Sequence, residues 1–289
     1  VEPSVYQKYS KLSYVDSMKS MSGDTGKLIA KEIGSAKKEY GLSYQEYWDK
    51  LKTGEVSNPE VEKLLQEVPK TVATESDVPT TLWIDMCKKN PSVSRMLELE
   101  EKSFDVMSAE EKSALKTYTG NGYSNMNAYL RSIGAGYLNA TTRYEEEVKL
   151  CHEALGRVTL GQEMVLRRGT DVGDLAGLFM KGNFVENFNF LYDKTAEEIN
   201  EMFQGQVGTY FGFTSTSSQW DRGFSGEIEV LLRCPPETKA SSIMGISRYG
   251  TGEGETLLRD NTKVKCLLIE ESDGHKGSDI RVYLEVIPD

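Results

Sequence analysis

The sequence contains few of the side chains from which many active sites are built. Its 289 residues include only two histidines, His152 and His275, and four cysteines that never form a CxxC pair. A histidine-based catalytic triad and a His-rich metal site are therefore disfavoured, and closely spaced zinc ligands are missing, so we expect no metal. A dense disulfide framework is also disfavoured, whereas one or two bridges are compatible with the spacing.

Long apolar runs and an excess of positive charge are lacking as well. No segment is apolar over the thickness of a bilayer, so we expect no membrane span. The formal net charge of -11 argues against the broad basic surface of a nucleic-acid-binding protein and against docking on anionic lipid. A local basic pocket could still hold an anionic cofactor. No signal-peptide pattern follows Val1, and a start at valine suggests a trimmed chain.

Two regions with different patterns meet near residue 105. Apolar residues at helical spacing predict a helical region over residues 1–105, where the capping box Ser43–Glu46 opens one helix. This region has no catalytic signature, and its role, partner binding or bracing, is open. A second capping box, Ser108–Glu111, opens residues 106–289, in which helices are followed by strands.

Short segments rich in β-branched and aromatic residues predict strands in the second region. Consecutive strands mostly lack helices between them, so we expect antiparallel or mixed sheets packed on the preceding helices, an α+β domain. The predicted strands are 164–168, 207–215, 227–232, 256–258, 263–269 and 280–287.

Two polar clusters follow predicted strands. Arg167 and Arg168 are successive residues of one strand and point to opposite sides of it, so one of them faces inward and needs an anionic partner. A diphosphate suits the guanidinium fork. The run Ser215-Thr216-Ser217 lacks a nearby base that would activate a nucleophilic serine, which favours a scaffolding hydroxyl that holds a carboxylate.

The third cluster is the glycine-rich stretch 249–255, which contains Glu253 and Glu255. A chain that leaves this turn in an extended conformation would point both carboxylates to the same side, where they can divide proton transfer and charge stabilisation. The alternative is a solvated acidic loop. The glycines do not match the GxGxxG fingerprint of dinucleotide-binding folds, because Glu255 occupies the place of its third glycine.

In chain order, an arginine on one strand, an aromatic-x-Ser-Thr-Ser strand and a Glu-x-Glu strand resemble the arginine-serine-glutamate class of mono-ADP-ribosyltransferases. The class includes the enzymatic components of clostridial binary toxins, the C3-like exoenzymes and the vertebrate ecto-ADP-ribosyltransferases. The resemblance covers roughly residues 108–289 and implies a catalytic domain of two packed, mostly antiparallel β-sheets flanked by helices. It further implies a bacterial or phage toxin that is secreted or delivered into a target cell.

The resemblance also implies NAD as co-substrate and names the residues that would hold it. Arg167 is similar to the arginine that braces the NAD site, and Arg168 to its diphosphate-binding neighbour. Leu166 stands where the class usually has tyrosine, so either arginine could be the essential one. Three further residues match in spacing those that line the NAD pocket of the binary toxin enzymes. The implied NAD-binding set is Tyr118, Tyr123, Asn127, Arg168, Gly169 and Thr216.

On the resemblance, two carboxylates transfer ADP-ribose from NAD to an arginine side chain and release nicotinamide. Ser215 orients Glu255, whose carboxylate stabilises the positive charge that develops on the ribose. Glu253 occupies the position that selects arginine in Glu-x-Glu enzymes, and a carboxylate there can draw a proton off the acceptor guanidinium. Tyr249 is a candidate for packing against the target protein, with a structural role in the turn as the alternative.

Other functions fit parts of this pattern. A NAD glycohydrolase would use the same residues with water as acceptor. A non-catalytic NAD-binding module would need a lost catalytic residue, yet the arginine, the serine and both glutamates are present. A glycosidase needs carboxylates on opposite sides of a sugar, which adjacent extended positions do not supply. Besides the target protein, residues 1–105 could engage a delivery or host partner.

Overall fold

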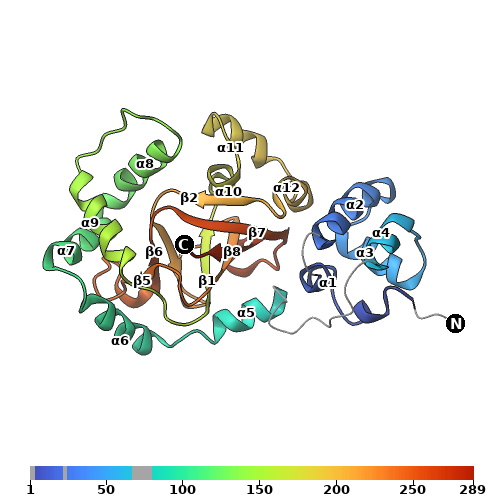
Figure 1. Cartoon of the computed structure of the whole chain (residues 1–289), viewed down its shortest axis with the longest axis horizontal. Helices are drawn as coiled ribbons and strands as arrows, with labels where there is room; N and C mark the ends of the chain where they lie inside the picture. Colours follow the sequence, from blue (N-terminus) through green and yellow to red (C-terminus); the bar gives the residue numbers. More distant parts are fainter. Residues whose placement is uncertain (1–3, 22–24, 67–79) are drawn as a thin grey trace.

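The computed structural model describes residues 4–21, 25–66 and 80–289, which form a helical lobe and a sheet-based body (Figure 1). The lobe packs around Trp48, a fully buried side chain with the rings of Tyr6 and Tyr9 edge-on at 5.6 and 5.8 Å. The apolar residues that are spaced as in a helix in the sequence form the core of this lobe. The lobe comprises a 3-10 turn (Gln7–Tyr9), α1 (Tyr14–Ser20), α2 (Thr25–Tyr40), α3 (Tyr44–Thr53) and α4 (Pro59–Gln66).

The capping boxes are formed as the sequence predicts. At the start of α3 the Ser43 hydroxyl accepts the Glu46 N–H at 3.1 Å, and the Glu46 carboxylate accepts the Ser43 N–H at 3.0 Å. These bonds satisfy backbone donors that the first helical turn leaves free. Gly54 ends α3 with a φ of 77°, in the left-handed region. The same reciprocal bonds open α7 (Ala109–Thr117) and α12 (Ala196–Phe203).

The body is built on a sheet with the strand order β2-β7-β8-β4-β1-β3-β6-β5. Neighbouring strands run antiparallel except β4 and β8, which are parallel. The α+β class and the mostly antiparallel pairing are therefore confirmed. The strands are β1 (Met164–Thr170), β2 (Val207–Tyr210), β3 (Thr214–Ser217), β4 (Ile228–Cys234), β5 (Ala240–Ser242), β6 (Glu255–Leu258), β7 (Thr262–Glu271) and β8 (Ile280–Ile287).

The sheet differs in one respect from the two packed sheets implied by the resemblance. Strands β1 and β3 are hydrogen-bonded neighbours, so the ladder continues across the middle of the body. Their contact rests on one register pair, Arg167 opposite Ser217, whereas β1 pairs with β4 along its whole length. The two halves are thus joined into one sheet at a narrow seam between β1 and β3.

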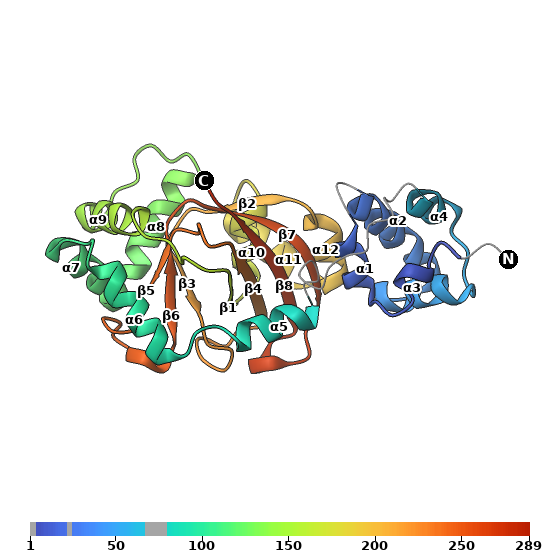
Figure 2. The same ribbon diagram turned by 60° about the horizontal axis from the view of Figure 1, so that its bottom comes forward.

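Helices cover the two halves of the sheet at opposite ends (Figure 2). Helices α10 (Val172–Phe179) and α12 pack against β2 and β7, beside α11 (Phe184–Tyr192) and next to the N-terminal lobe. At the other end, α7, α8 (Tyr123–Gly134) and α9 (Glu145–Gly156) stand over β3, β5 and β6. Their buried side chains form a core with residues of β6 and of the turn before β3.

Helices α5 (Thr80–Lys88) and α6 (Val93–Phe104) run along the sheet, with α5 on β1 and α6 on β5. The buried carboxylate of Glu100 in α6 accepts the Gly245 N–H and the Ser242 hydroxyl, both at 2.9 Å. Burial raises the pKa of Glu100, and these hydrogen bonds oppose that rise. Helix α6 therefore anchors the chain just ahead of the acidic stretch 249–255.

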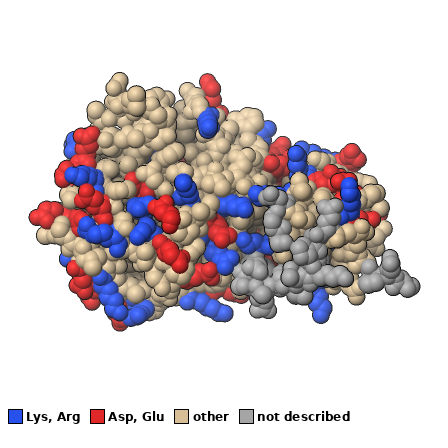
Figure 3. Space-filling view, in the orientation of Figure 1, with Lys and Arg blue, Asp and Glu red and all other residues tan. Residues whose placement is uncertain are grey.

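Charges of both signs are interspersed over the surface around α6, whereas the surface over α8 is largely uncharged (Figure 3). All four cysteines are buried and free, so the bridges left open by the sequence are not formed. No helix within residues 4–21, 25–66 and 80–289 is long and apolar enough to cross a membrane. Over the same ranges, His, Cys, Asp and Glu side chains form no group that could hold a metal.

Trp83 fixes α5 to the sheet: its side chain is fully buried, and its ring lies edge-on to Tyr283 at 5.6 Å. Trp83→Ala should lower the free energy of unfolding by about 3–5 kcal/mol, because it removes a large apolar contact and leaves a cavity. Urea unfolding followed by circular dichroism measures the loss, with Tyr137→Ala as a control at a side chain that is 69% exposed. An unchanged midpoint in Trp83→Ala would contradict this packing.

Candidate active site

Strands β1, β3 and β6 bring the three polar clusters of the sequence together at the seam. Ser217 of β3 lies opposite Arg167 of β1 on one side and opposite Glu255 of β6 on the other. The clusters, with part of the loop after β3, line one small cavity. Its lining residues are Arg167, Arg168, Gly169, Ser215, Thr216, Ser217, Gly223, Phe224, Glu253 and Glu255.

Glu255 is held by hydroxyl groups at the start of β6. The Ser215 hydroxyl donates to Glu255 Oε1 at 2.9 Å, and the Tyr118 hydroxyl lies 3.4 Å from the same serine oxygen. Only 6% of Glu255 is exposed, so burial raises the pKa of its carboxyl. The Ser215 hydrogen bond opposes the rise, and the nearby Glu253 charge adds to it. Ser215 therefore orients this carboxylate and favours its ionised form.

Glu253 reaches the same cavity by a route that differs from the expected extended chain. Its backbone is helical, with φ -92° and ψ -15°, and Gly254 follows with a φ of 60°. A Cβ at Gly254 would lie 2.9 Å from Gln219 Cγ and 3.0 Å from Ser217 Oγ, so glycine is required there. The turn at Gly254, and not strand alternation, brings the two carboxylates together. Burial raises the pKa of Glu253 as well.

Arg168 lines the same cavity as these carboxylates. Its guanidinium donates to the Ser215 carbonyl at 2.9 Å and forms an ion pair with Asp174 of α10 at 3.1 Å. The Tyr210 hydroxyl donates to the same Asp174 carboxylate at 2.8 Å. Burial disfavours the charged arginine, but Asp174 and Tyr210 outweigh that effect and raise the pKa of Arg168. The arginine is thus oriented by the strand that carries Ser215.

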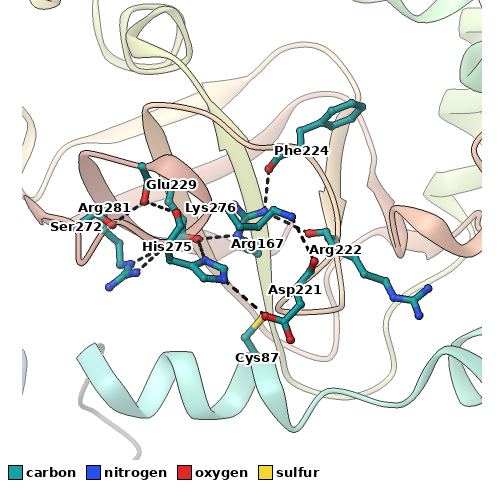
Figure 4. A network of polar contacts seen from close by, with 12 residues as sticks. Cys87, Arg167, Asp221, Arg222, Phe224, Glu229, Ser272, His275, Lys276 and Arg281 are labelled. Carbon is teal, nitrogen blue, oxygen red and sulfur yellow. Dashed lines mark hydrogen bonds and ion pairs between the residues drawn. The ribbon is translucent and has the colours of Figure 1, made fainter.

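Arg167 points to the opposite side of β1, as alternation along a strand requires. Only 1% of it is exposed, and its Nε donates to the Glu229 carboxylate of β4 at 2.6 Å. Its Nη1 donates to the carbonyls of Phe224 and Arg222 at 2.9 and 3.3 Å (Figure 4). The structure therefore separates the two arginines: Arg168 binds the Ser215 strand, and Arg167 lies beneath a loop.

The expected tyrosines and asparagine lie where α7 gives way to α8. Tyr118 begins a π-helical turn (Tyr118–Gly122), and its buried ring packs edge-on against Phe213 at 5.5 Å. Asn127 Nδ2 donates to the Tyr118 hydroxyl at 3.0 Å, while its Oδ1 is buried without a partner. A carbonyl oxygen left in this state can accept a donor from a ligand. Tyr123 is 54% exposed.

The remaining predicted residues have different surroundings. Thr216 is buried, and its hydroxyl donates to the Thr256 carbonyl at 2.7 Å, which is a bond within the sheet. A Cβ at Gly169 would lie 2.2 Å from the Phe224 carbonyl oxygen, so this glycine allows the loop after β3 to approach β1. Tyr249 is 57% exposed and precedes a 3-10 turn (Gly250–Gly252).

Two residues near the site were not identified from the sequence. Asp174 is the anionic partner of Arg168. The sequence indicated that an arginine here needs such a partner, but not which residue it is. Phe224 is 56% exposed and lines the cavity beside the carboxylates. The available signal for Phe224 was an aromatic residue next to Gly223 in the segment that follows the Ser-Thr-Ser strand.

A family model described as ADP-ribosyltransferase exoenzyme matches residues 70–283. The chain belongs to this family. The family resemblance drawn from the sequence is thereby confirmed, and the chain is an ADP-ribosyltransferase of the toxin type. No curated protein matched the chain.

Solved structures share the fold at low sequence identity. Plx2a, an ADP-ribosyltransferase toxin from Paenibacillus larvae, is 24% identical with a TM-score of 0.56, over 67% of this chain and 94% of that one. C3stau2 from S. aureus, solved with NAD, is 18% identical with a TM-score of 0.57, over 70% and 99%. The enzymatic component C2-I of the C2-toxin from Clostridium botulinum is 21% identical with a TM-score of 0.52, over 69% and 47%.

The surroundings of Glu255 predict opposite responses to two substitutions. Ser215→Ala removes a hydrogen bond to the carboxylate and should raise the pKa of Glu255 further. Glu253→Gln removes a like charge and should lower it. Titration of labelled glutamate carboxyl carbons by NMR measures both shifts, with Glu237→Gln as a control at a glutamate outside the cavity. Shifts of the same sign in the two variants would contradict this description of the site.

Proposed function

We propose that this ADP-ribosyltransferase uses NAD to modify an arginine side chain of a target protein and releases nicotinamide. The observation that carries the proposal is the pair of carboxylates in one cavity, Glu255 held by Ser215 and Glu253 beside it. Arg168 of β1 lines the same cavity and donates to the Ser215 carbonyl. The three groups are the ones that an arginine-directed transfer requires.

The residues around the cavity fit an anionic dinucleotide. Arg168 offers the second N–H of Nη1 and of Nη2, which its bonds to Ser215 and Asp174 do not use. Arg131, an exposed residue of α8, adds a second positive charge one helical turn from Asn127. Asn127 contributes its unpartnered Oδ1 as an acceptor for a ligand N–H or O–H. NAD bound here supplies the chemistry, an activated bond between ribose and nicotinamide. We infer that Arg168 is the essential arginine, because Arg167 is engaged on the opposite side of β1.

Glu255 acts on the ribose in this proposal. As nicotinamide leaves, positive charge develops on the sugar, and a fixed carboxylate beside it lowers the barrier. The hydrogen bond from Ser215 holds the carboxylate in place before the reaction, so little reorganisation is needed. The ionised form is the active one, and activity should therefore fall when the pH drops through the raised pKa of Glu255.

Glu253 acts on the acceptor. A guanidinium is cationic and poorly nucleophilic, so attack on the ribose carbon requires that a base accept one of its protons. The Glu253 carboxylate can orient the arginine by two N–H bonds and take that proton as the new carbon–nitrogen bond forms. Two exposed rings lie close to Glu253. Tyr249 precedes it in the sequence, and Phe224 lines the same cavity. We propose that Tyr249 contacts the target protein and that Phe224 stacks on a flat ring of the bound nucleotide.

The N-terminal helices are proposed to serve delivery or partner binding, in an enzyme secreted or delivered into a target cell. The expected division into residues 1–105 and 106–289 falls after α6, although α5 and α6 pack on the sheet. Helices α1–α4 are therefore the part of the N-terminal region that is best placed for a partner. Lys37 of α2, 3% exposed, binds Glu197 of α12 at 2.5 Å and joins that lobe to the body.

Substitution of the two glutamates separates transfer from NAD cleavage. Glu255→Gln should lower kcat for NAD cleavage by roughly 10²–10³-fold and abolish protein modification, because the charge beside the ribose is lost. Glu253→Gln should abolish arginine modification and leave much of the NAD hydrolysis, since water needs no help from that residue. Nicotinamide release and label transfer from NAD to protein, measured in parallel, distinguish the two steps. Full transferase activity in Glu255→Gln would refute the assignment.

The proposal as a whole is tested with tagged NAD in a cell lysate, followed by identification of the labelled protein and residue. Label on arginine supports it. Nicotinamide release without labelled protein would instead favour the NAD glycohydrolase, which uses the same cavity with water as acceptor. Binding of NAD without nicotinamide release would favour a non-catalytic module.

A further inference from the structure

Arg167 has no part in the reaction proposed above, yet it is one of the largest fully buried side chains of the protein. Its guanidinium lies beneath residues 218–226, the loop that connects β3 with β4, hereafter the 218–226 loop. This loop carries Phe224 at the cavity. A buried arginine needs ion pairs and hydrogen bonds to replace its lost hydration. The partners of Arg167 therefore indicate its role in the structure.

The charge of Arg167 is balanced by a carboxylate that Arg281 and His275 also contact. Glu229, with no exposed surface, accepts Arg167 Nε at 2.6 Å and Arg281 Nε at 2.9 Å (Figure 4). His275 Nδ1 lies 2.5 Å from the same carboxylate. Burial alone would raise the pKa of Glu229, but the bonds from His275, Arg167 and Arg281 lower it. These bonds favour the ionised form of Glu229, which pairs with Arg167.

The Nη1 group of Arg167 is bonded to backbone of the 218–226 loop, whereas its Nη2 is buried without a hydrogen-bond partner. Its Nη1 donates to the Phe224 carbonyl at 2.9 Å and to the Arg222 carbonyl at 3.3 Å. Figure 4 shows both carbonyls turned toward Arg167, while the Phe224 ring and the Arg222 side chain extend away from it. A planar fork with several donors in fixed directions can hold a carboxylate and two carbonyls at once.

The 218–226 loop is bonded in turn to the acidic stretch 249–255. Arg222 Nη1 donates to the Thr251 carbonyl at 2.5 Å, and the Ser218 N–H donates to the Gly254 carbonyl at 3.0 Å. These contacts stand on either side of Glu253. The backbone that presents the acceptor carboxylate is therefore supported by the same loop that Arg167 holds.

The 218–226 loop is also attached through Trp220 to the residues around Glu229. The ring of Trp220 stacks on His275, with centroids 3.9 Å apart and an angle of 11° between the planes. His275 is in turn bonded to Glu229. The turn from Asp221 to Phe224 is thus held on both sides by residues bonded to Glu229: His275 contacts Trp220 before it, and Arg167 contacts Phe224 at its end.

We propose that Arg167 is a positioning residue of the transferase. Paired with Glu229, it fixes the carbonyls of Arg222 and Phe224, and so sets both the Phe224 ring and the backbone around Glu253. The inference rests on the proposed function only for its kinetic consequence. Its structural consequence, a loop that loosens when Arg167 is changed, holds whatever the enzyme modifies.

The structural consequence is tested with Arg167→Lys, which keeps a positive charge for Glu229 but lacks the planar fork. Trypsin cleavage after Arg222, identified by fragment mass, should become about tenfold faster, as expected for the loss of one charge-assisted hydrogen bond. The control is Arg233→Lys, the same substitution on β4 at a side chain paired with Glu163. It should leave this cleavage rate unchanged. An unchanged rate in Arg167→Lys would overturn the proposal.

The kinetic consequence is tested by NAD cleavage in a double-mutant cycle. Arg167→Lys and Phe224→Ala should each raise KM for NAD by about tenfold, and the double variant should be no worse than Phe224→Ala alone. Additive effects would overturn the proposal, because Arg167 would then act by a route other than the loop. If the unaltered enzyme cleaves no NAD, the proposed function fails, while the proteolysis experiment still decides the positioning role.

If Arg167→Lys does not fold, a second variant tests the link between this loop and NAD binding. Gly223 has a φ of 80°, and a Cβ there would lie 2.9 Å from Ser217 Cβ. Gly223→Ala therefore displaces the 218–226 loop and leaves the ion pairs of Arg167 intact. The same rise in KM is expected, in a protein that still unfolds cooperatively. An unaltered KM in Gly223→Ala would overturn the link between this loop and NAD binding.

Discussion

The arrangement of the site depends on one constraint, the opposite direction of successive side chains on a strand. Arg167 and Arg168 are neighbours on β1, so they must face opposite sides of the sheet. Arg168 is bonded to the Ser215 carbonyl and to Asp174, and Arg167 is bonded to Glu229 and to the 218–226 loop. Both guanidinium groups are paired with a carboxylate, because an unpaired charge at this depth would destabilise the fold.

The short ladder between β1 and β3 is a second feature on which the site depends. A ladder of many register pairs would bring β3 flush against β1 and leave no space between their ends. Here the ladder is reduced to the pair Arg167 and Ser217, and residues of both strands line the cavity. The close approach of the loop backbone to Gly169 closes the other side. The site is therefore a gap in the sheet with charged residues fixed on its walls.

Local patterns in the sequence predicted much of this. Capping boxes identified helix starts because they involve neighbouring residues, and the polar clusters on predicted strands identified the cavity walls. Pairing between different elements was beyond reach. Asp174 follows Arg168 by only six residues, but it lies on the next helix, and Glu229 lies 62 residues after Arg167. The left-handed turn at Gly254 was also missed, because Glu-x-Glu read as a strand hides a change of backbone direction at its middle residue.

The net charge of -11 and an anion-binding site are compatible for a local reason. On the face of Arg168 that guanidinium is matched by Asp174, so the pair alone offers an anionic ligand little net attraction. Arg131 on α8 forms no ion pair within residues 4–21, 25–66 and 80–289, and its charge interacts with those of both Arg168 and Asp174. In the proposed site it adds positive charge beside that pair. Asp174 then has a different use: it holds Arg168 aligned before a ligand arrives, which reduces the entropy that binding must overcome. A site can be selective for an anion through such prealignment while the protein as a whole stays strongly acidic.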